Sequence, residues 1–134
     1  MASALLLAVP AQAQFQSQGY KFLEAVKKHD GDTVEKMLSS SGSKTTPGDI
    51  IINARDITTG DSALHIVIAR RDRLWLEFLI SKGANVNIRN TQGVTPLVAA
   101  CNINFIEGVE VLVAHSARVD DPNNTGETPL IAAV

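Results

Sequence analysis

Cysteine and aromatic residues are scarce in this sequence. Cys101 is the single cysteine among 134 residues, and Phe, Tyr and Trp together make up 4%. One thiol excludes a disulfide within the chain and any zinc site built from several cysteines. Hydrophobic residues still reach 45%, which is ample for a core. That core must be packed by Leu, Val, Ile and Ala, a composition that suits packed helices.

Positive charge is scarce as well. Twelve Lys and Arg residues against fourteen Asp and Glu give a net charge of −2. Affinity for nucleic acid or for anionic membranes requires clustered Lys and Arg, so we expect no nucleic-acid partner. The apolar run near the N-terminus is too short to span a bilayer, and we expect no stable membrane insertion.

Motifs for catalysis, metals and cofactors are missing. His29, His65 and His115 are spaced so that no two share a helical turn, and no calcium loop is present. The sequence has no Gly-rich phosphate cradle, no nucleophile elbow and no kinase motif. Cys101 follows Ala99 and Ala100, a setting that predicts a buried, inert thiol. We therefore expect no enzyme, no metal and no cofactor.

A five-residue segment recurs at a fixed spacing. Gly93–Leu97 (GVTPL) returns as Gly126–Leu130 (GETPL) and, in a degraded form, as Gly60–Leu64 (GDSAL), 33 residues apart each time. A period of that length indicates one supersecondary unit copied along the chain.

The end of the unit repeats too, because Ser81–Asn87 (SKGANVN) corresponds to Ala114–Asp120 (AHSARVD). Here the sequence resembles the ankyrin repeat family, with its Gly-x-Thr-Pro-Leu-His opening, two helices and Gly-Ala-x-x-Asn ending. The resemblance implies an all-α solenoid of stacked helix-turn-helix units with β-turn or hairpin tips. It also implies that His65 hydrogen-bonds across repeats and that the general activity is protein binding.

The period divides residues 20–134 into a divergent first repeat (20–38), an inserted loop (39–52), two repeats (53–87 and 88–120) and a truncated repeat (121–134). Leu38 and Ile80 are 42 residues apart where 33 is expected, so the insertion adds nine residues. The loop either contacts a partner or is a tolerated excursion. Because a repeat cannot bury its apolar face alone, we expect the C-terminal end to continue into further repeats or to be covered by another chain.

Residues 1–13 read as the end of a secretory signal, with an apolar run, a break at Pro10 and the small-x-small sequence Ala11–Ala13. No Lys or Arg precedes the run, which departs from that pattern. Residues 14–19 are polar and unpatterned, and we interpret them as a leader. The signal predicts an exported, periplasmic chain that begins near Gln14. The alternative is a cytoplasmic protein whose N-terminal helix lies on the first repeat.

Local chemistry predicts how the helices begin and end. Thr95 can cap a helix that starts with Pro96. Asn104 tolerates the left-handed conformation needed after it, whereas Arg71 and His29 occupy the same place in their repeats and predict strained or reshaped turns.

The period also predicts one packing contact. Trp75 and Gly108 are 33 residues apart, and equivalent positions stack in a solenoid. We expect the indole to fill the space that Gly108 leaves.

Carried over position by position, the resemblance places a partner on the tips and first helices. We call this surface the strip; its residues are Lys27, Lys28, Thr58, Thr59, Asp61, Arg70, Arg71, Thr91, Gln92, Val94, Asn102, Asn124, Thr125 and Glu127. Its basic first part fits a partner with an acidic segment, although exposed cations can equally serve solubility alone. The sequence therefore predicts a non-enzymatic module for an unidentified protein partner. The alternative is a regulatory segment of a longer protein with an enzymatic or membrane domain beyond the C-terminus.

Overall fold

The computed structural model describes residues 11–40, 51–119, 124 and 126, and within them every regular element is a helix. These helices are α1 (Ala11–Lys27), α2 (Gly31–Ser40), α4 (Ala63–Ala69), α5 (Arg73–Ser81), α6 (Pro96–Asn102) and α7 (Ile106–Ala114). Consecutive helices pair as α1 with α2, α4 with α5, and α6 with α7.

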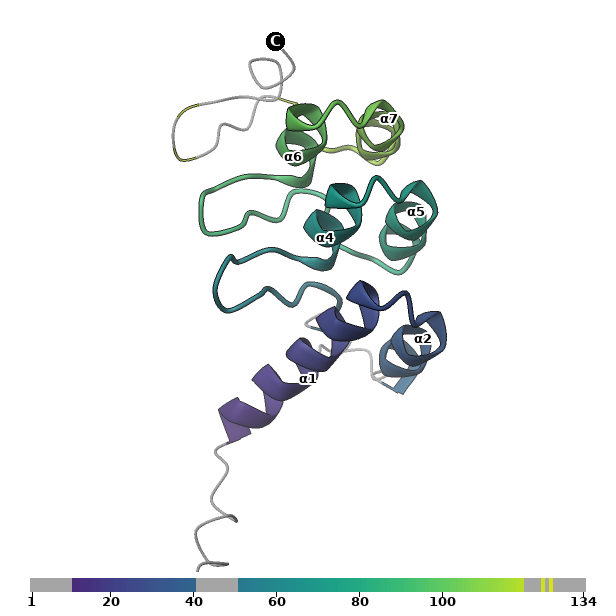
Figure 1. Ribbon diagram of the computed structural model, residues 1–134, viewed down its shortest axis with the longest axis vertical. Helices are drawn as coiled ribbons and strands as arrows, with labels where there is room; N and C mark the ends of the chain where they lie inside the picture. Colours follow the sequence, from purple (N-terminus) through teal and green to yellow (C-terminus); the bar gives the residue numbers. More distant parts are fainter. Residues whose placement is uncertain (1–10, 41–50, 120–123, 125, 127–134) are drawn as a thin grey trace, which may run out of the picture.

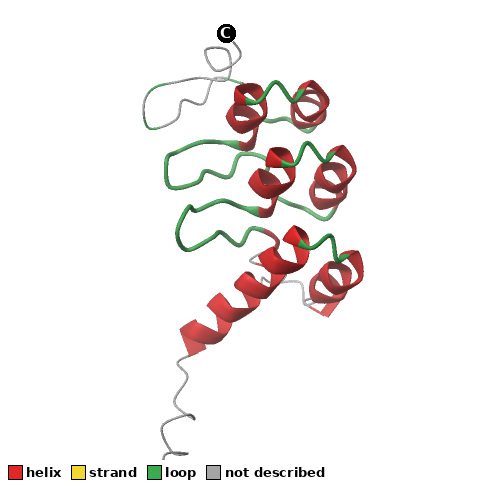
Figure 2. Ribbon diagram, viewed as in Figure 1, coloured by secondary structure: helices red, strands yellow, loops and turns green. Residues whose placement is uncertain are grey.

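The helix pairs stack into a short solenoid. Helices α1, α4 and α6 follow one another in one column, and α2, α5 and α7 form a second column beside it (Figure 1). The long loops between pairs all project to one side, beyond the first column (Figure 2). The predicted all-α solenoid with hairpin-like tips is confirmed; Arg55 and Ser62 even form an isolated antiparallel bridge at the base of one tip.

The same apolar position recurs at the centre of each pair. Phe22, Leu64 and Leu97 are 0%, 1% and 2% exposed, so the divergent first repeat has the register that the period predicts. Leu130, the fourth member of this predicted row, lies outside the described residues. Each of the three side chains is covered by its own pair and the neighbouring pair, as nearest-neighbour stacking requires.

Polar side chains fix where the helices begin. Ser62 Oγ accepts a hydrogen bond from the His65 amide at 3.5 Å, and Thr95 Oγ1 accepts one from the Val98 amide at 3.3 Å. Pro96 follows Thr95, where its missing N–H leaves no bond unmade. The predicted cap of α6 is confirmed.

The turn between the helices of each pair has one geometry throughout. His29, Arg71 and Asn104 have φ values of 58°, 56° and 56°. In each case the amide of that residue donates to the carbonyl three residues earlier. The expectation of reshaped turns at His29 and Arg71 is wrong, because the backbone bond holds all three residues in the left-handed region that side chains normally avoid.

The inserted loop is shorter than predicted. Ile51 and Ile52 are helical and only 8% and 2% exposed, and α2 extends to Ser40. Ile51 takes the place that Ala84 and Ala117 have in the later repeats, and all three are 8% exposed. The predicted loop 39–52 is therefore wrong at both ends; residues 41–50 lie outside the described part of the chain.

The predicted leader is also wrong as a structural segment. Helix α1 begins at Ala11 and runs through residues 14–19 without a break. Residues 1–10 lie outside the described part, and export stays a prediction. Among the residues that are described, no helix has the length and hydropathy needed to cross a bilayer.

The predicted contact between Trp75 and Gly108 is wrong. A Cβ added at Gly108 would overlap the ring of Phe105, which lies one turn earlier in the same repeat. Trp75 instead packs toward the preceding repeat, edge to face with His29 at 5.8 Å between ring centroids, and 4.0 Å from a Cβ built on Gly31. Phe105 reaches the space first because it is 3% exposed and belongs to the same turn.

Gly108→Ala should destabilise the chain. Overpacking costs about 1–3 kcal/mol, while the better helix propensity of Ala returns about 1 kcal/mol, so we expect a net loss of about 1–2 kcal/mol in the free energy of unfolding. Urea denaturation measures it. Gly31→Ala is the matched control, because the nearest atom leaves room there and the change should be neutral or stabilising by up to about 1 kcal/mol. Equal effects in both variants would contradict this packing.

Candidate partner-binding surface

Adjacent tips are joined edge to edge by backbone hydrogen bonds. The Thr91 amide donates to the Thr59 carbonyl at 3.2 Å, and the Asn124 amide donates to the Gln92 carbonyl at 2.9 Å. Thr91 Oγ1 and Asn124 Nδ2 add bonds to the preceding tip at 2.8 Å and 3.1 Å. Gly60 permits this approach, since a Cβ there would lie 2.6 Å from the Thr91 nitrogen. The tips thus form one ribbon with a fixed spacing.

Carboxylate and amide side chains shape each tip from within. Asp56 Oδ1 accepts from the amides of Thr58 and Thr59 at 2.7 Å and 3.2 Å. These bonds hold the pKa of the Asp56 carboxyl below its ordinary value. In the next tip, Asn90 Oδ1 accepts from two amides, and its Nδ2 donates to Asp61 Oδ1 at 3.0 Å. Asp61 is therefore held in a contact between repeats.

His65 links two repeats through both of its ring nitrogens. The Ser62 amide donates to Nδ1 at 3.2 Å, so Nε2 carries the proton and donates to the Val94 carbonyl at 2.8 Å. Burial lowers the pKa of His65 below its ordinary value of 6.5, against smaller opposing effects of the Val94 bond and Asp61. The predicted cross-repeat role of His65 is confirmed.

Arg70 supports the first repeat. Its Nη1 donates to the carbonyls of Val26 and Lys27 at 2.9 Å and 3.0 Å, at the C-terminal end of α1. Its Nη2 lies 4.0 Å from Asp72, and its side chain is 25% exposed. The guanidinium therefore spends its hydrogen bonds on the neighbouring repeat.

The left-handed turn residues reach forward by one repeat. His29 Nε2 lies 3.0 Å from Asp72 Oδ2, and the Arg71 guanidinium donates to the carbonyls of Ile103 and Asn104. Side chains at equivalent places thus join successive turns, which explains why His and Arg are accommodated where a smaller residue was expected.

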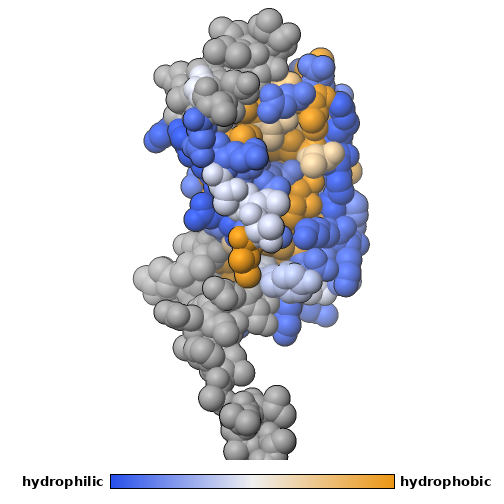
Figure 3. Space-filling model, turned by 60° about the vertical axis from the view of Figure 1, so that its left-hand side comes forward, coloured by the Kyte–Doolittle hydropathy of each residue, from blue (hydrophilic) through white to orange (hydrophobic). Residues whose placement is uncertain are grey.

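The tips and first helices that carry the strip project toward one side of the solenoid. Hydrophilic side chains cover the tips, and a band of hydrophobic side chains runs beside them (Figure 3). Nine members of the strip are exposed, namely Lys27, Lys28, Thr58, Thr59, Arg71, Thr91, Gln92, Asn102 and Asn124. Asp61, Arg70 and Val94 are half-buried, and Thr125 and Glu127 lie outside the described residues.

Two exposed apolar residues near the strip were not expected. Ile57 is 79% exposed and Tyr20 is 60% exposed. Ile57 stands one period before Asn90, which orders its own tip, so the mismatch was readable from the sequence. The exposure of Tyr20 was not, because it follows from the course of α1.

No chemistry beyond binding is indicated in the described part of the chain. No cluster of three or more His, Cys, Asp or Glu that could hold a metal ion occurs there. Cys101 is half-buried rather than fully buried, and burial raises the pKa of its thiol, which disfavours the reactive thiolate.

The fold and this surface define a scaffold of stacked helical repeats with a ribbon of tips. A profile of ankyrin repeats in three copies matches residues 65–134, and the chain belongs to the ankyrin repeat family. It is 43% identical over 54 residues to the ankyrin repeat protein FPV031 of fowlpox virus (strain NVSL), covering 40% of this chain and 16% of that protein.

The family is also evident in three dimensions. The crystal structure of the ankyrin repeat domain of Bcl-3, described as a unique member of the IkappaB protein family, matches with a TM-score of 0.73 at 27% identity. The match covers 84% of this chain and 46% of that one. The chain thus spans less than half the length of either protein.

Acidification should weaken the fold through His65. Its folded-state pKa lies below 6.5, so the unfolded chain binds the proton more readily. The stabilisation by the neutral ring is present above about pH 6.5 and is lost as the pH falls through the folded-state pKa. We expect the free energy of unfolding to fall between neutral pH and pH values below 6.5, with a smaller slope in His65→Gln. Parallel slopes in the two proteins would argue against this role.

Arg70→Met should loosen α1 while keeping an apolar stem. Hydrogen bonds to charged groups contribute about 1.5–3 kcal/mol, and partial exposure reduces that, so we expect a loss of about 1–2 kcal/mol. Lys28→Met, at an exposed position, should change stability by less than about 0.5 kcal/mol. Thermal unfolding of both variants measures the difference; a tolerated Arg70→Met would contradict the supporting role.

Proposed function

Ankyrin repeat proteins are generally protein–protein interaction modules and are typically non-enzymatic. We propose that this chain acts by binding a protein partner along the strip. The ribbon of tips supports this proposal most directly, because its backbone is fixed by bonds between repeats while the side chains of Thr58, Gln92 and Asn124 remain exposed. A preorganised surface loses little conformational entropy when a partner binds.

The structure narrows which part of the strip is available. Arg70 and Asp61 are engaged in contacts between repeats. Lys27 lies 3.5 Å from Glu24 and 3.9 Å from Asp56. The charge available to attract an acidic partner is therefore smaller than the sequence implied. We assign recognition to the polar tips and the exposed part of α6 rather than to a basic patch.

The regulatory alternative uses the same surface. In a longer protein the partner would be a further domain of the same polypeptide, and the contacts on the strip would be intramolecular.

A photo-crosslinking amino acid placed along the strip should capture a defined partner. Gln92 and Asn102 are exposed on a tip and on α6, and we expect both positions to give the same crosslinked protein in cells. Mass spectrometry of the crosslinked peptides identifies it. A crosslink to the chain's own polypeptide would instead support the regulatory alternative.

Glu107 provides the control position, because it is exposed on α7 in the second column of helices. A specific partner should crosslink at Gln92 and not at Glu107. Equal capture at both positions, or no common product at the two strip positions, would refute binding along the strip.

A further inference from the structure

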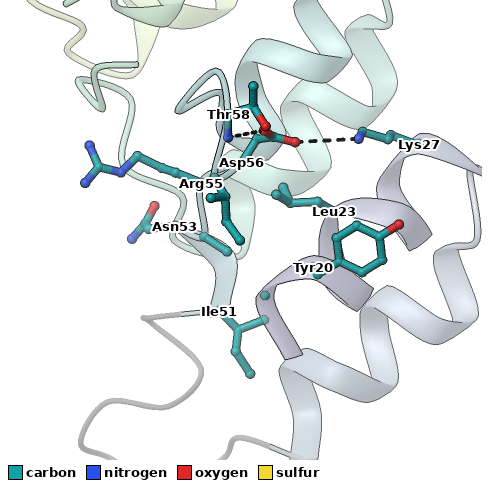
Figure 4. A pocket seen from close by; sticks show the side chains of 11 residues that line it. Tyr20, Leu23, Lys27, Ile51, Asn53, Arg55, Asp56 and Thr58 are labelled. Atoms are coloured by element: carbon teal, nitrogen blue, oxygen red, sulfur yellow. Dashed lines mark hydrogen bonds and ion pairs between the residues drawn. The ribbon is translucent and has the colours of Figure 1, made fainter. Parts of the chain in front are cut away.

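A groove of about 420 Å³ lies outside the strip, between α1 and the segment 53–58 (Figure 4). Its apolar walls come from both sides, with Tyr20 and Leu23 on α1 facing Ile51, Ala54 and Ile57. Tyr20 and Ile57 are among the most exposed large hydrophobic residues in the described part of the chain. Ligand sites in proteins commonly have volumes of about 300–1,000 Å³.

The groove exists because the first repeat has a helix where the others have a tip. Helices α4 and α6 begin at Ala63 and Pro96, whereas α1 extends ten residues further, from Ala11 rather than from the equivalent Lys21. No earlier tip therefore covers the tip at 53–62. Helix α1 meets that tip only at Gly19, where an added Cβ would lie 3.2 Å from the Ala54 Cβ.

The polar groups at the groove are already paired. The Thr58 amide corresponds to the Thr91 amide that joins two tips, but it donates to Asp56 instead. On the rim, Lys27 lies 3.9 Å from Asp56 and 3.5 Å from Glu24, and the first of these contacts crosses the groove in Figure 4. The best occupant is therefore apolar and uncharged, since a charged one would have no free counterion.

The chain itself carries such a segment close by. Residues 1–10 (MASALLLAVP) contain no charged side chain and include three consecutive leucines, Leu5–Leu7. Pro10 disfavours helical backbone at Val9, so the chain can change direction there. From Ala11 to Tyr20 the helix rises roughly 14 Å, and residues 4–9 span roughly 20 Å when extended, enough to reach the groove.

We propose that residues 4–9 fold back along α1 and bury their leucines in the groove between Tyr20 and Ile57. This contact closes the uncovered end of the ribbon of tips and assigns the N-terminal segment to the fold rather than to a cleaved signal. It does not depend on the proposed partner.

Paramagnetic NMR on the full chain tests the contact. A nitroxide on Ala8→Cys, in a Cys101→Ser background, should broaden the methyl signals of Ile51 and Ile57 and leave those of Val111 unchanged. Replacing Leu5–Leu7 by serine keeps the same tether and removes the apolar anchor. The broadening should then be largely lost. Broadening of equal extent in the serine variant would overturn the proposal, because it would reflect the tether alone.

A pair of matched substitutions tests the groove side. Ile57 and Leu74 are 79% and 77% exposed but lie on different faces. Ile57→Asp should abolish the broadening at Ile51, and Leu74→Asp should leave it intact. An intact mass that begins near Gln14 in protein purified from its native host would overturn the proposal as well, because the segment would be absent.

Discussion

Each helix pair in this chain can bury its apolar side only against the next pair, and the remaining features result from that constraint. The row of Phe22, Leu64 and Leu97 requires neighbouring pairs to keep one register. The bonds of His65 to Val94 and of Arg70 to the end of α1 hold that register with polar groups. Where the pairs are fixed, the tips are fixed too, so a binding surface arises from the stacking that stabilises the fold.

Much of this architecture could be predicted because the repeat makes the sequence its own comparison. The 33-residue period placed the helices, the cap at Thr95 and the role of His65 correctly. The period failed where residues act within a repeat instead of between repeats. The ring of Phe105 fills the space at Gly108 from three residues away, and no comparison between equivalent positions reveals that contact.

Other features depend on the paths that flanking segments take. Ile51 substitutes for an alanine of the repeat, which is invisible until the end of the insertion is known. The polar residues 14–19 gave no helical period, yet α1 continues through them. The strip was predicted only as positions; that Arg70 and Asp61 serve neighbouring repeats depends on side-chain directions that a sequence does not contain.

The helical extension of α1 makes the two ends of the solenoid unlike. Head-to-tail contacts between identical subunits build open filaments when the two contacting surfaces match. At the N-terminal end a helix replaces the tip, and Asp56 binds the Thr58 amide that would receive another tip. A second copy cannot continue the ribbon across that end. The scaffold thereby gains a built-in polarity that opposes fibre growth at high concentration.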